Sequence, residues 1–479
     1  MTEPHDDLDN WLHTRIEPMQ PPPGTFERIR KNARRRKRRQ ALLSAASAGA
    51  VAAVITLAVV ALPKVVPTVL HLHSHQAGHS AAAPAPSSSP ISTTAGTPFT
   101  AHSYPVNRLP SVPPNFQATS VTFASLQTGW VIGQAAVGVP GYCRTGYCTS
   151  MARTDNAGKS WYGLHAPLAG APDGPAGVSQ VRFLNTETGW AFGPELFATH
   201  DGGATWARVP VPNGMRVTSL ETVGSAAFAV FAQCTGTGED FAAGCTRFFL
   251  YSSLVTGNDW TPVPGLAGGF ALNSGAASSA TIVLTHSEGY LYTPDGKLFS
   301  GPATAGAAWQ LVSPTSLPCL PGPAEADGQP SGGQLAASAP GDLALVCPPG
   351  QAGGTQSGGH PQVIYTSVNG GHSWLPHGGL PIPATVTSLA ASTGGVLAVG
   401  TSQGIEVSPD NGATWRLTLH GAGVSYVGLT SPLQGVAVPA DTSLHQLWFT
   451  FDGGQSWQAS AIANGLSPGK VTRRQPQPA

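Results

Sequence analysis

The chain has 479 residues, and its 24 lysines and arginines balance 24 aspartates and glutamates, so its formal net charge is zero. Only 10% of its residues are charged, whereas 59 are glycine and 44 are proline. This composition argues against an average soluble enzyme and is typical of many short strands joined by turns.

The N-terminal part predicts a membrane anchor. Residues 28–39 hold nine lysines or arginines and are followed by an uncharged apolar stretch from Ala41 to Leu62. At about 1.5 Å per residue, that stretch reaches the ~30 Å thickness of a bilayer's hydrocarbon core. A cleaved signal peptide is the alternative, but its apolar region runs only about 7 to 15 residues. We therefore expect a cytoplasmic arm at 1–40, a single transmembrane helix at 41–62 in the plasma membrane, and an extracytoplasmic remainder.

The same basic run is a weak sign of nucleic-acid binding. Beside a membrane span it more often sets topology and contacts lipid headgroups, so no nucleic acid is expected.

Residues 63–114 are rich in Ala, Ser, Pro and Thr, which predicts a flexible stalk. The stalk contains His71, His73, His75 and His79, whose imidazoles could chelate a transition metal. Because flexible histidine tracts bind metal weakly, this one is interpreted as a polar spacer, and no metal site or cofactor is assigned. Residues 466–479 are predicted to be a disordered tail.

Tryptophan recurs through residues 115–465 at intervals of 41 to 65 residues. The recurring residues are Trp161, Trp206, Trp260, Trp309, Trp374, Trp415 and Trp457. A period of about 40 to 50 residues that holds four strands is typical of a propeller blade. The sequence therefore predicts an all-β fold, a seven-bladed propeller with four-stranded antiparallel blades.

Five of these tryptophans close a motif of the form S/T-x-D/N-x-G-x-S/T-W. Its Asx residues are Asn156, Asp201, Asn369, Asp410 and Asp452. An Asx oxygen can accept hydrogen bonds from nearby backbone amides, the glycine provides a positive φ, and the tryptophan starts the next strand as an apolar wedge. The motif thus predicts a turn between the third and fourth strands. Near Trp260 and Trp309 the Asx residue is missing, so those blades are predicted from spacing and strand content alone.

The Asx turn resembles the Asp-box, or BNR, repeat of sialidases and other secreted propellers. Its combination with an earlier Gly-Trp pair, as at Gly189–Trp190, is similar to the photosystem II assembly and stability factor family. The resemblance spans roughly residues 116 to 462 and implies the propeller fold, while the function differs widely among its members. With one copy per blade, the Asp-box carboxylates are expected to be structural.

A glycoside hydrolase, sialidase-like or other, is the alternative that the motif raises. The sialidase family's Arg-Ile-Pro signature has a partial match at Arg108–Pro110. That chemistry also needs an arginine triad and a tyrosine nucleophile paired with a glutamate. None of the outer arginines lies in a recognisable family context: Arg144, Arg153, Arg182, Arg208, Arg216, Arg247 and Arg416. Sialidase propellers also have six blades, so no catalytic residue is assigned.

Six cysteines all follow the predicted membrane span. An even number in an oxidising compartment predicts disulfides, and fifteen connectivities are possible. Sequential pairing is the simplest, namely Cys143 with Cys148, Cys234 with Cys245, and Cys319 with Cys347. A zinc site is disfavoured, because no pair has the two-to-four-residue spacing with a second pair nearby.

The loops that depart from the repeat indicate where a partner would bind. The connections between second and third strands are long in blades one, three and five, at Gln134–Thr149, Cys234–Cys245 and Gly350–His360. They are expected on the face opposite the Asx turns, where a propeller would recognise a partner. Exposed aromatic and arginine side chains in these loops are the candidates, because such side chains supply much of the binding energy at protein surfaces. The candidates are Tyr142, Arg144, Tyr147, Glu239, Asp240 and Phe241. The alternative is that these cross-linked loops only stabilise the fold. The predicted function is that of a membrane-anchored, non-catalytic recognition or assembly module for a protein or cell-surface glycan.

Overall fold

The structure is a computed structural model. It describes residues 111–135, 148–170, 176–234, 245–271, 280–293, 296–312, 318–319, 333–347, 363–380 and 384–462. All of these belong to the compact unit Thr97–Ala479. The predicted arm, membrane helix and tail, and nearly all of the predicted stalk, lie outside the described residues. Among the residues that are described, no helix has the length and apolarity needed to span a bilayer.

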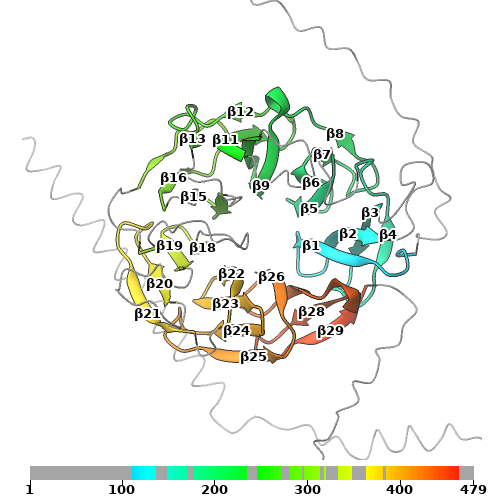
Figure 1. The fold of residues 1–479 in the computed structure, drawn as a ribbon, viewed down its shortest axis with the longest axis vertical. Coiled ribbons are helices and arrows are strands. Elements are labelled where there is room, and N and C mark those ends of the chain that lie inside the picture. The colour runs from blue at the N-terminus through cyan, green and yellow to red at the C-terminus, as the bar shows by residue number, and fades with distance from the viewer. Residues whose placement is uncertain are drawn as a thin grey trace, which may run out of the picture. The chain divides into compact units, whose positions relative to one another are not determined.

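Seven antiparallel sheets, each built from consecutive strands, follow one another around a ring (Figure 1). Blade one comprises β1 (Gln117–Phe123), β2 (Gly129–Ala135), β3 (Cys148–Thr154) and β4 (Tyr162–Leu164). Blade two comprises β5 (Val178–Phe183), β6 (Gly189–Pro194), β7 (Leu196–Thr199) and β8 (Ala207–Arg208). Blade three comprises β9 (Arg216–Val223), β10 (Ala226–Cys234), β11 (Cys245–Leu254) and β12 (Thr261–Pro262).

Blade four comprises β14 (Thr281–Leu284), β15 (Glu288–Tyr292), β16 (Leu298–Pro302) and β17 (Gln310–Leu311), and blade five comprises β18 (Gln334–Ala339), β19 (Asp342–Val346), β20 (Val363–Ser367) and β21 (Leu375–Gly379). Blade six comprises β22 (Val386–Ser392), β23 (Val396–Thr401), β24 (Gly404–Ser408) and β25 (Arg416–His420). Blade seven comprises β26 (Val424–Leu429), β27 (Gly435–Pro439), β28 (Gln446–Thr450) and β29 (Gln458–Ala461). The prediction of seven four-stranded blades is confirmed. Blade three differs in one detail, since a short fifth strand, β13 (Phe270–Ala271), also pairs with β11.

The second strand of each blade is buried on both faces, because blades pack face to face around the ring. Strand β10 has the sequence AAFAVFAQC, and its first seven residues are all buried. The outermost strands are more exposed, and both residues of β8 are exposed. Burial on both faces explains why the second strands are mostly apolar at successive positions, whereas a strand with one solvent-exposed face alternates.

Each apolar cluster of the core joins two neighbouring blades. Trp130 and Ile132 of blade one pack with Val181 and Phe183 of blade two. The ring of Trp130 stacks on that of Phe183, with centroids 3.7 Å apart and an interplanar angle of 3°. The core of this fold therefore lies between blades, and a large side chain there stabilises two blades at once.

The ring closes between blades seven and one. Among the described strands, none is shared between these blades, since each sheet contains only consecutive strands. His445 Nδ1 lies 3.1 Å from the carbonyl oxygen of Phe116. The Gln434 side-chain amide donates to the carbonyl oxygen of Leu126 at 2.9 Å. Val121 of blade one packs with Phe449 of blade seven. Among the described residues, side chains and apolar packing thus provide the closure that a shared strand provides in other propellers.

Candidate functional site

The five Asx turns share one hydrogen-bond pattern. In blade two, Asp201 Oδ1 accepts from the Thr199 hydroxyl at 2.8 Å and from the backbone N–H of Thr205 at 2.9 Å. The Gly203 N–H donates to Thr199 Oγ1 at 3.0 Å. The glycines at this position have φ between +80° and +91° across the five turns, a region that favours glycine. Each Asx side chain is therefore engaged within its own turn.

Asp and Asn are exchanged in these turns through one adaptable hydroxyl. The Thr205 hydroxyl donates to Asp201 Oδ2 at 2.5 Å. In blade one the direction is reversed, because the Asn156 amide donates to Ser160 Oγ at 2.7 Å. A hydroxyl can either donate or accept, so both versions of the turn are satisfied.

The hydrogen bonds also change the acidity of the aspartates. Partial burial alone would raise the pKa of Asp201, but hydrogen bonds from Thr205 and Thr199 outweigh it and lower that pKa from its ordinary value. Thr414 and Ser408 likewise lower the pKa of Asp410. At Asp452 burial again acts in the opposite direction, and Ser456 and Thr450 outweigh it.

We expect these three aspartates to make the propeller sensitive to acid. A carboxyl whose pKa is lower in the folded state stabilises the fold above its unfolded pKa, and this stabilisation is lost as pH falls through the folded pKa. The free energy of unfolding should thus decrease below about pH 4. The check is denaturant unfolding between pH 7 and pH 2.5, with Asp201→Asn, Asp410→Asn and Asp452→Asn combined. Blades one and five carry Asn at this position, so the combined variant should fold and lose less stability in acid. An undiminished acid loss would contradict the prediction.

The Asx turns lie on the same face as the turns between first and second strands. The residue after the Asx donates its backbone N–H to the other turn of its own blade, as Gly202 does to the Glu187 carbonyl oxygen at 2.8 Å. The same bond recurs in blades one, five, six and seven. In a four-stranded meander, the connections from second to third strands and between blades must then lie on the opposite face.

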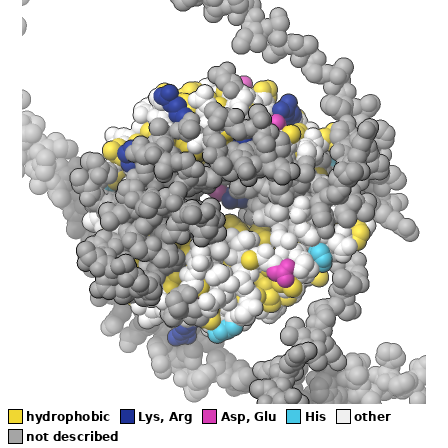
Figure 2. Space-filling model, viewed as in Figure 1, with side chains coloured by type: hydrophobic (Ala, Val, Ile, Leu, Met, Phe, Trp, Pro, Cys, Tyr) yellow, Lys and Arg dark blue, Asp and Glu magenta, His cyan; other side chains and the backbone are white. Residues whose placement is uncertain are grey.

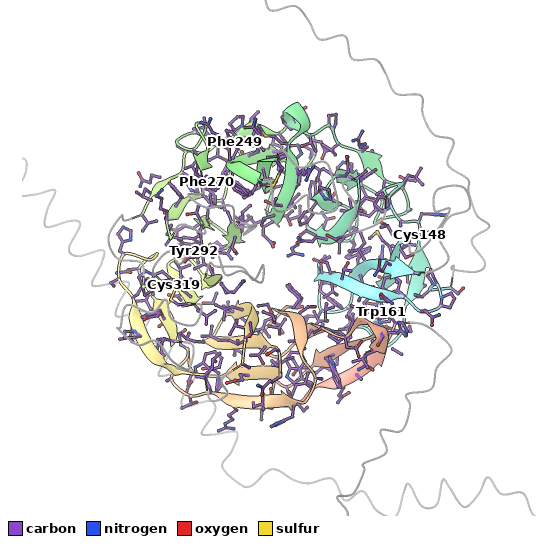
Figure 3. The ribbon with its side chains drawn as sticks, viewed as in Figure 1. Cys148, Trp161, Phe249, Phe270, Tyr292 and Cys319 are labelled. Carbon is purple, nitrogen blue, oxygen red and sulfur yellow. A yellow bond between two sulfur atoms is a disulfide. The ribbon has the colours of Figure 1, made fainter. Side chains whose placement is uncertain are left out.

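The described cysteines gather on that opposite face. Cys234 and Cys245 form a disulfide between the end of β10 and the start of β11. Cys347, which follows β19, is bonded to Cys319 in the connection between blades four and five. Cys319 packs with Tyr292 between those blades (Figure 3). Cys148 begins β3 and is also disulfide-bonded, while Cys143, its expected partner, lies outside the described residues.

The six candidate partner-binding residues are not placed by the structure. Tyr142, Arg144, Tyr147, Glu239, Asp240 and Phe241 all lie outside the described residues. The strands that carry their loops are described, so both loops start and end on the disulfide-bearing face, at Ala135 and Cys148 in blade one and at Cys234 and Cys245 in blade three.

Three of the arginines of the propeller pair with three different carboxylates. Arg153 lies 2.9 Å from Asp155, Arg182 lies 2.8 Å from Glu221, and Arg208 lies 2.7 Å from Glu195. They belong to the third strand of blade one and to the first and last strands of blade two. Each of these guanidinium groups has its own counterion on its own part of the ring. Among the described residues, no group of three or more His, Cys, Asp or Glu side chains could hold a metal ion.

Side chains from four first strands meet near the centre of the ring, a group that the sequence reasoning missed. The first strands are the innermost (Figure 1), and Figure 2 shows basic and acidic side chains in the hollow at the centre. Arg182 Nε donates to Glu221 Oε1 at 2.8 Å, and its Nη1 lies 3.5 Å from Ser120 Oγ. Its guanidinium carbon lies 6.0 Å from the ring centroid of Tyr426, two blades away. Burial would lower the pKa of Arg182, but Glu221 outweighs it and raises the pKa.

A Thr-Ser pair on the first strand holds the next blade, and this signal was present in the sequence. Thr119 Oγ1 donates to the Ser179 carbonyl oxygen at 2.8 Å, and Ser120 Oγ accepts from the Val181 N–H at 3.3 Å. Thr387 and Ser388 make the matching bonds to blade seven, at 2.7 and 2.8 Å. The repeated Thr-Ser dipeptide could have been found by aligning the first strands.

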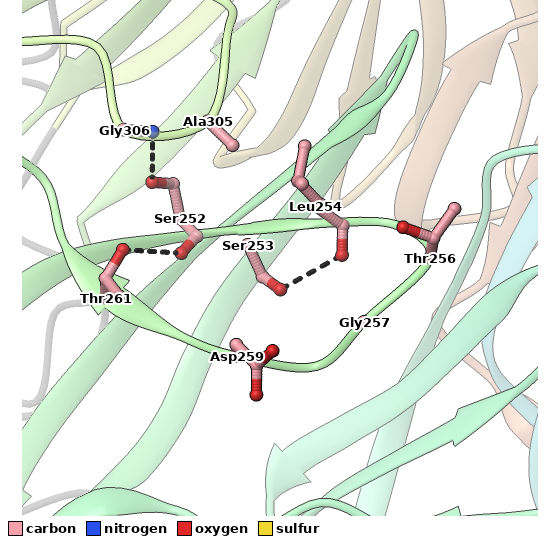
Figure 4. A pocket seen from close by; sticks show the side chains of 9 residues that line it. All are labelled: Ser252, Ser253, Leu254, Thr256, Gly257, Asp259, Thr261, Ala305 and Gly306. Carbon is pink, nitrogen blue, oxygen red and sulfur yellow. Dashed lines mark hydrogen bonds between the residues drawn. The ribbon is translucent and has the colours of Figure 1, made fainter.

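A pocket of about 350 Å³ opens on the Asx-turn face between blades three and four (Figure 4). Its lining comes from the end of β11, the last turn and the start of β12 in blade three, and from the last turn of blade four. It consists of Ser252, Ser253, Leu254, Thr256, Gly257, Asp259, Thr261, Ala305 and Gly306. These are the two blades that lack the Asx residue, so the pocket coincides with the loss of the motif.

Comparison with solved structures finds similarity in fold at low sequence identity. No protein-family model matches this chain, and no curated protein sequence does. Among solved structures, YCF48 bound to D1 peptide is 15% identical, with a TM-score of 0.45 over 72% of this chain and 99% of that one. The GH74 enzyme of Niastella koreensis is 12% identical, with a TM-score of 0.34 over 72% and 66%. The acylaminoacyl peptidase of Pyrococcus horikoshii is 8% identical, with a TM-score of 0.47 over 73% and 53%. At such identities, the function of this chain has to be inferred from its own residues.

Proposed function

We propose that the chain is an extracytoplasmic, membrane-anchored recognition module whose disulfide-bearing face binds a protein or a cell-surface glycan. The observation that supports this most directly is the distribution of cysteines. The two described disulfides and the disulfide-bonded Cys148 all lie at connections on one face of the ring. Structural disulfides persist in oxidising compartments, which agrees with a propeller on the outer side of the membrane.

Cross-linked loop ends on a rigid ring suit recognition. A disulfide restrains a loop before it binds, so less conformational entropy is lost when a partner is bound. The connections from second to third strands also vary in length from blade to blade, whereas the Asx turns repeat one geometry. Variation on a constant scaffold is the usual arrangement of binding loops.

On the Asx-turn face, the Asx side chains already use their hydrogen-bonding groups within the protein. The Asx carboxylates and carboxamides accept or donate hydrogen bonds inside their own turns. They therefore support the scaffold, and the loops of the opposite face provide the variable chemistry.

Affinity capture with the full-length chain tests the proposal. Tyr142→Ala, Tyr147→Ala and Phe241→Ala are combined in one variant, because aromatic side chains supply much of the binding energy at protein surfaces. Retention of the captured protein or glycan should fall at least about tenfold.

A matched variant removes three exposed apolar side chains from the Asx-turn face instead. Leu126, Leu433 and Phe451 are 49%, 63% and 45% exposed, so Leu126→Ala, Leu433→Ala and Phe451→Ala should leave the fold and the capture unchanged. If the aromatic triple variant keeps every partner, the loop face is not the binding surface. Hydrolysis of glycans by the pure protein would instead support a glycoside hydrolase.

A further inference from the structure

The pocket between blades three and four contains a carboxylate at a different position of the turn from the Asx residues of the other blades. Counted back from the closing tryptophan, Val255 occupies the position that Asp201 has in blade two. Asp259, directly before Trp260, occupies the position of Thr205. The acidic side chain of blade three is therefore at the C-terminal end of the turn, next to the tryptophan, and not at the Asx position.

This displacement leaves the carboxylate available. Both oxygens of Asp201 accept hydrogen bonds within the turn. Asp259 is exposed and, within the part of the chain that the structure describes, no hydrogen bond or ion pair reaches its oxygens. It is also the one charged residue among the described residues that line the pocket.

Two of the hydroxyls that line the pocket donate their protons to backbone carbonyls (Figure 4). Ser253 Oγ donates its proton to the Leu254 carbonyl oxygen at 3.0 Å, and Thr261 Oγ1 donates to the Ser252 carbonyl oxygen at 3.4 Å. A hydroxyl that has donated its proton can only accept from a ligand. Together with a carboxylate, which has acceptors only, these groups give the pocket a surplus of acceptors and one negative charge.

We propose that this pocket binds a primary ammonium group, such as the side chain of a lysine on a partner protein. An ammonium carries three donors, no acceptor and a positive charge, which is the complement of these groups. The volume of about 350 Å³ admits one such side chain. The site lies on the Asx-turn face, so it is separate from the loop surface proposed above and does not depend on it.

A neutral sugar fits less well, for two reasons. Its hydroxyls need donors as well as acceptors from the protein, and two of the pocket's four hydroxyl protons already go to backbone carbonyls. The lining also includes no aromatic ring among the residues described there. An ammonium uses the available groups more completely.

The test is the binding of dansylcadaverine, a fluorescent primary amine, to the full-length protein, with its N-acetylated form as the neutral probe. We expect the amine to bind with an affinity that falls with salt, and the acetylated probe to bind at least about tenfold more weakly. Asp259→Asn should weaken amine binding to a similar extent. The Asp259 side chain makes no hydrogen bond within the described protein, so this variant should fold normally.

Two further variants separate the pocket from general surface charge. Glu187→Gln removes an exposed carboxylate on the same face of blade two and should leave amine binding unchanged. Gly257→Ala places a methyl group 3.4 Å from Asp259 Oδ2, an ordinary contact, and should weaken binding by occupying the pocket. Equal binding of both probes, an unaffected Asp259→Asn variant, or a matching loss in Glu187→Gln would overturn the proposal. Asp259-dependent binding of a neutral monosaccharide without amine binding would do the same.

Discussion

Replacing Trp130 by alanine is expected to lower the free energy of unfolding by about 3 to 5 kcal/mol. Trp130 is fully buried, and its indole stacks on Phe183 of the next blade. Its Nε1 donates to the Gly202 carbonyl oxygen of the next blade's Asx turn at 2.9 Å. The alanine variant loses the apolar contact and leaves that carbonyl without this donor, so both effects weaken the junction of blades one and two.

Denaturant unfolding monitored by circular dichroism measures the loss, and Trp206→Ala is the matched control. Trp206 is partly exposed and lies edge-on to the same Phe183, with centroids 6.1 Å apart. Its removal should cost about 1 to 2 kcal/mol, because less apolar surface is buried. Trp130→Phe keeps the aromatic contact and should lie between the two. If Trp130→Ala and Trp206→Ala had equal effects, the stack between blades would not be the main source of stability.

The number of blades could be predicted because tryptophan marks the same packing position in every blade. Trp309 is 1% exposed although its turn has no Asx residue, and Trp260 lies against Phe231 with centroids 5.6 Å apart. Their apolar role is independent of the turn's hydrogen bonds, so the spacing survived where the motif was lost. The short strand β13 had no such marker, since its pairing with β11 depends on a loop particular to blade three.

The central group could not be predicted in the same way, because its members share no motif. Arg182, Glu221 and Tyr426 come from three different blades, and only closure of the ring brings the last of them close to the other two.

The pocket between blades three and four could not be predicted for a different reason. It forms where the Asx residue is absent, and a search for the motif passes over the positions that fail to match it.

The pair formed by Arg182 and Glu221 provides the second large expected effect. Their side chains are 18% and 31% exposed, so neither charge is fully hydrated. Glu221→Gln leaves the guanidinium in place without its counterion, and we expect a loss of about 2 to 3 kcal/mol in the free energy of unfolding. Solvent on the Glu221 side keeps this below the loss for a fully buried pair.

Replacing both partners by apolar residues should be much less harmful than removing one. In the variant with Arg182→Met and Glu221→Leu, no charge is left uncompensated, and the two side chains can pack against the ring of Tyr426. Such replacements of buried ion pairs are often neutral in stability. A double-mutant cycle that compares Arg182→Met, Glu221→Leu and the variant with both changes, measured by denaturant unfolding, gives the coupling energy. Losses that simply add would mean that the pair is screened by solvent in the central hollow. A double variant more stable than either single variant would show that each charge near the axis is tolerated only because the other one neutralises it. Pairing of the two charges would then be what makes the first strands of blades two and three compatible with each other.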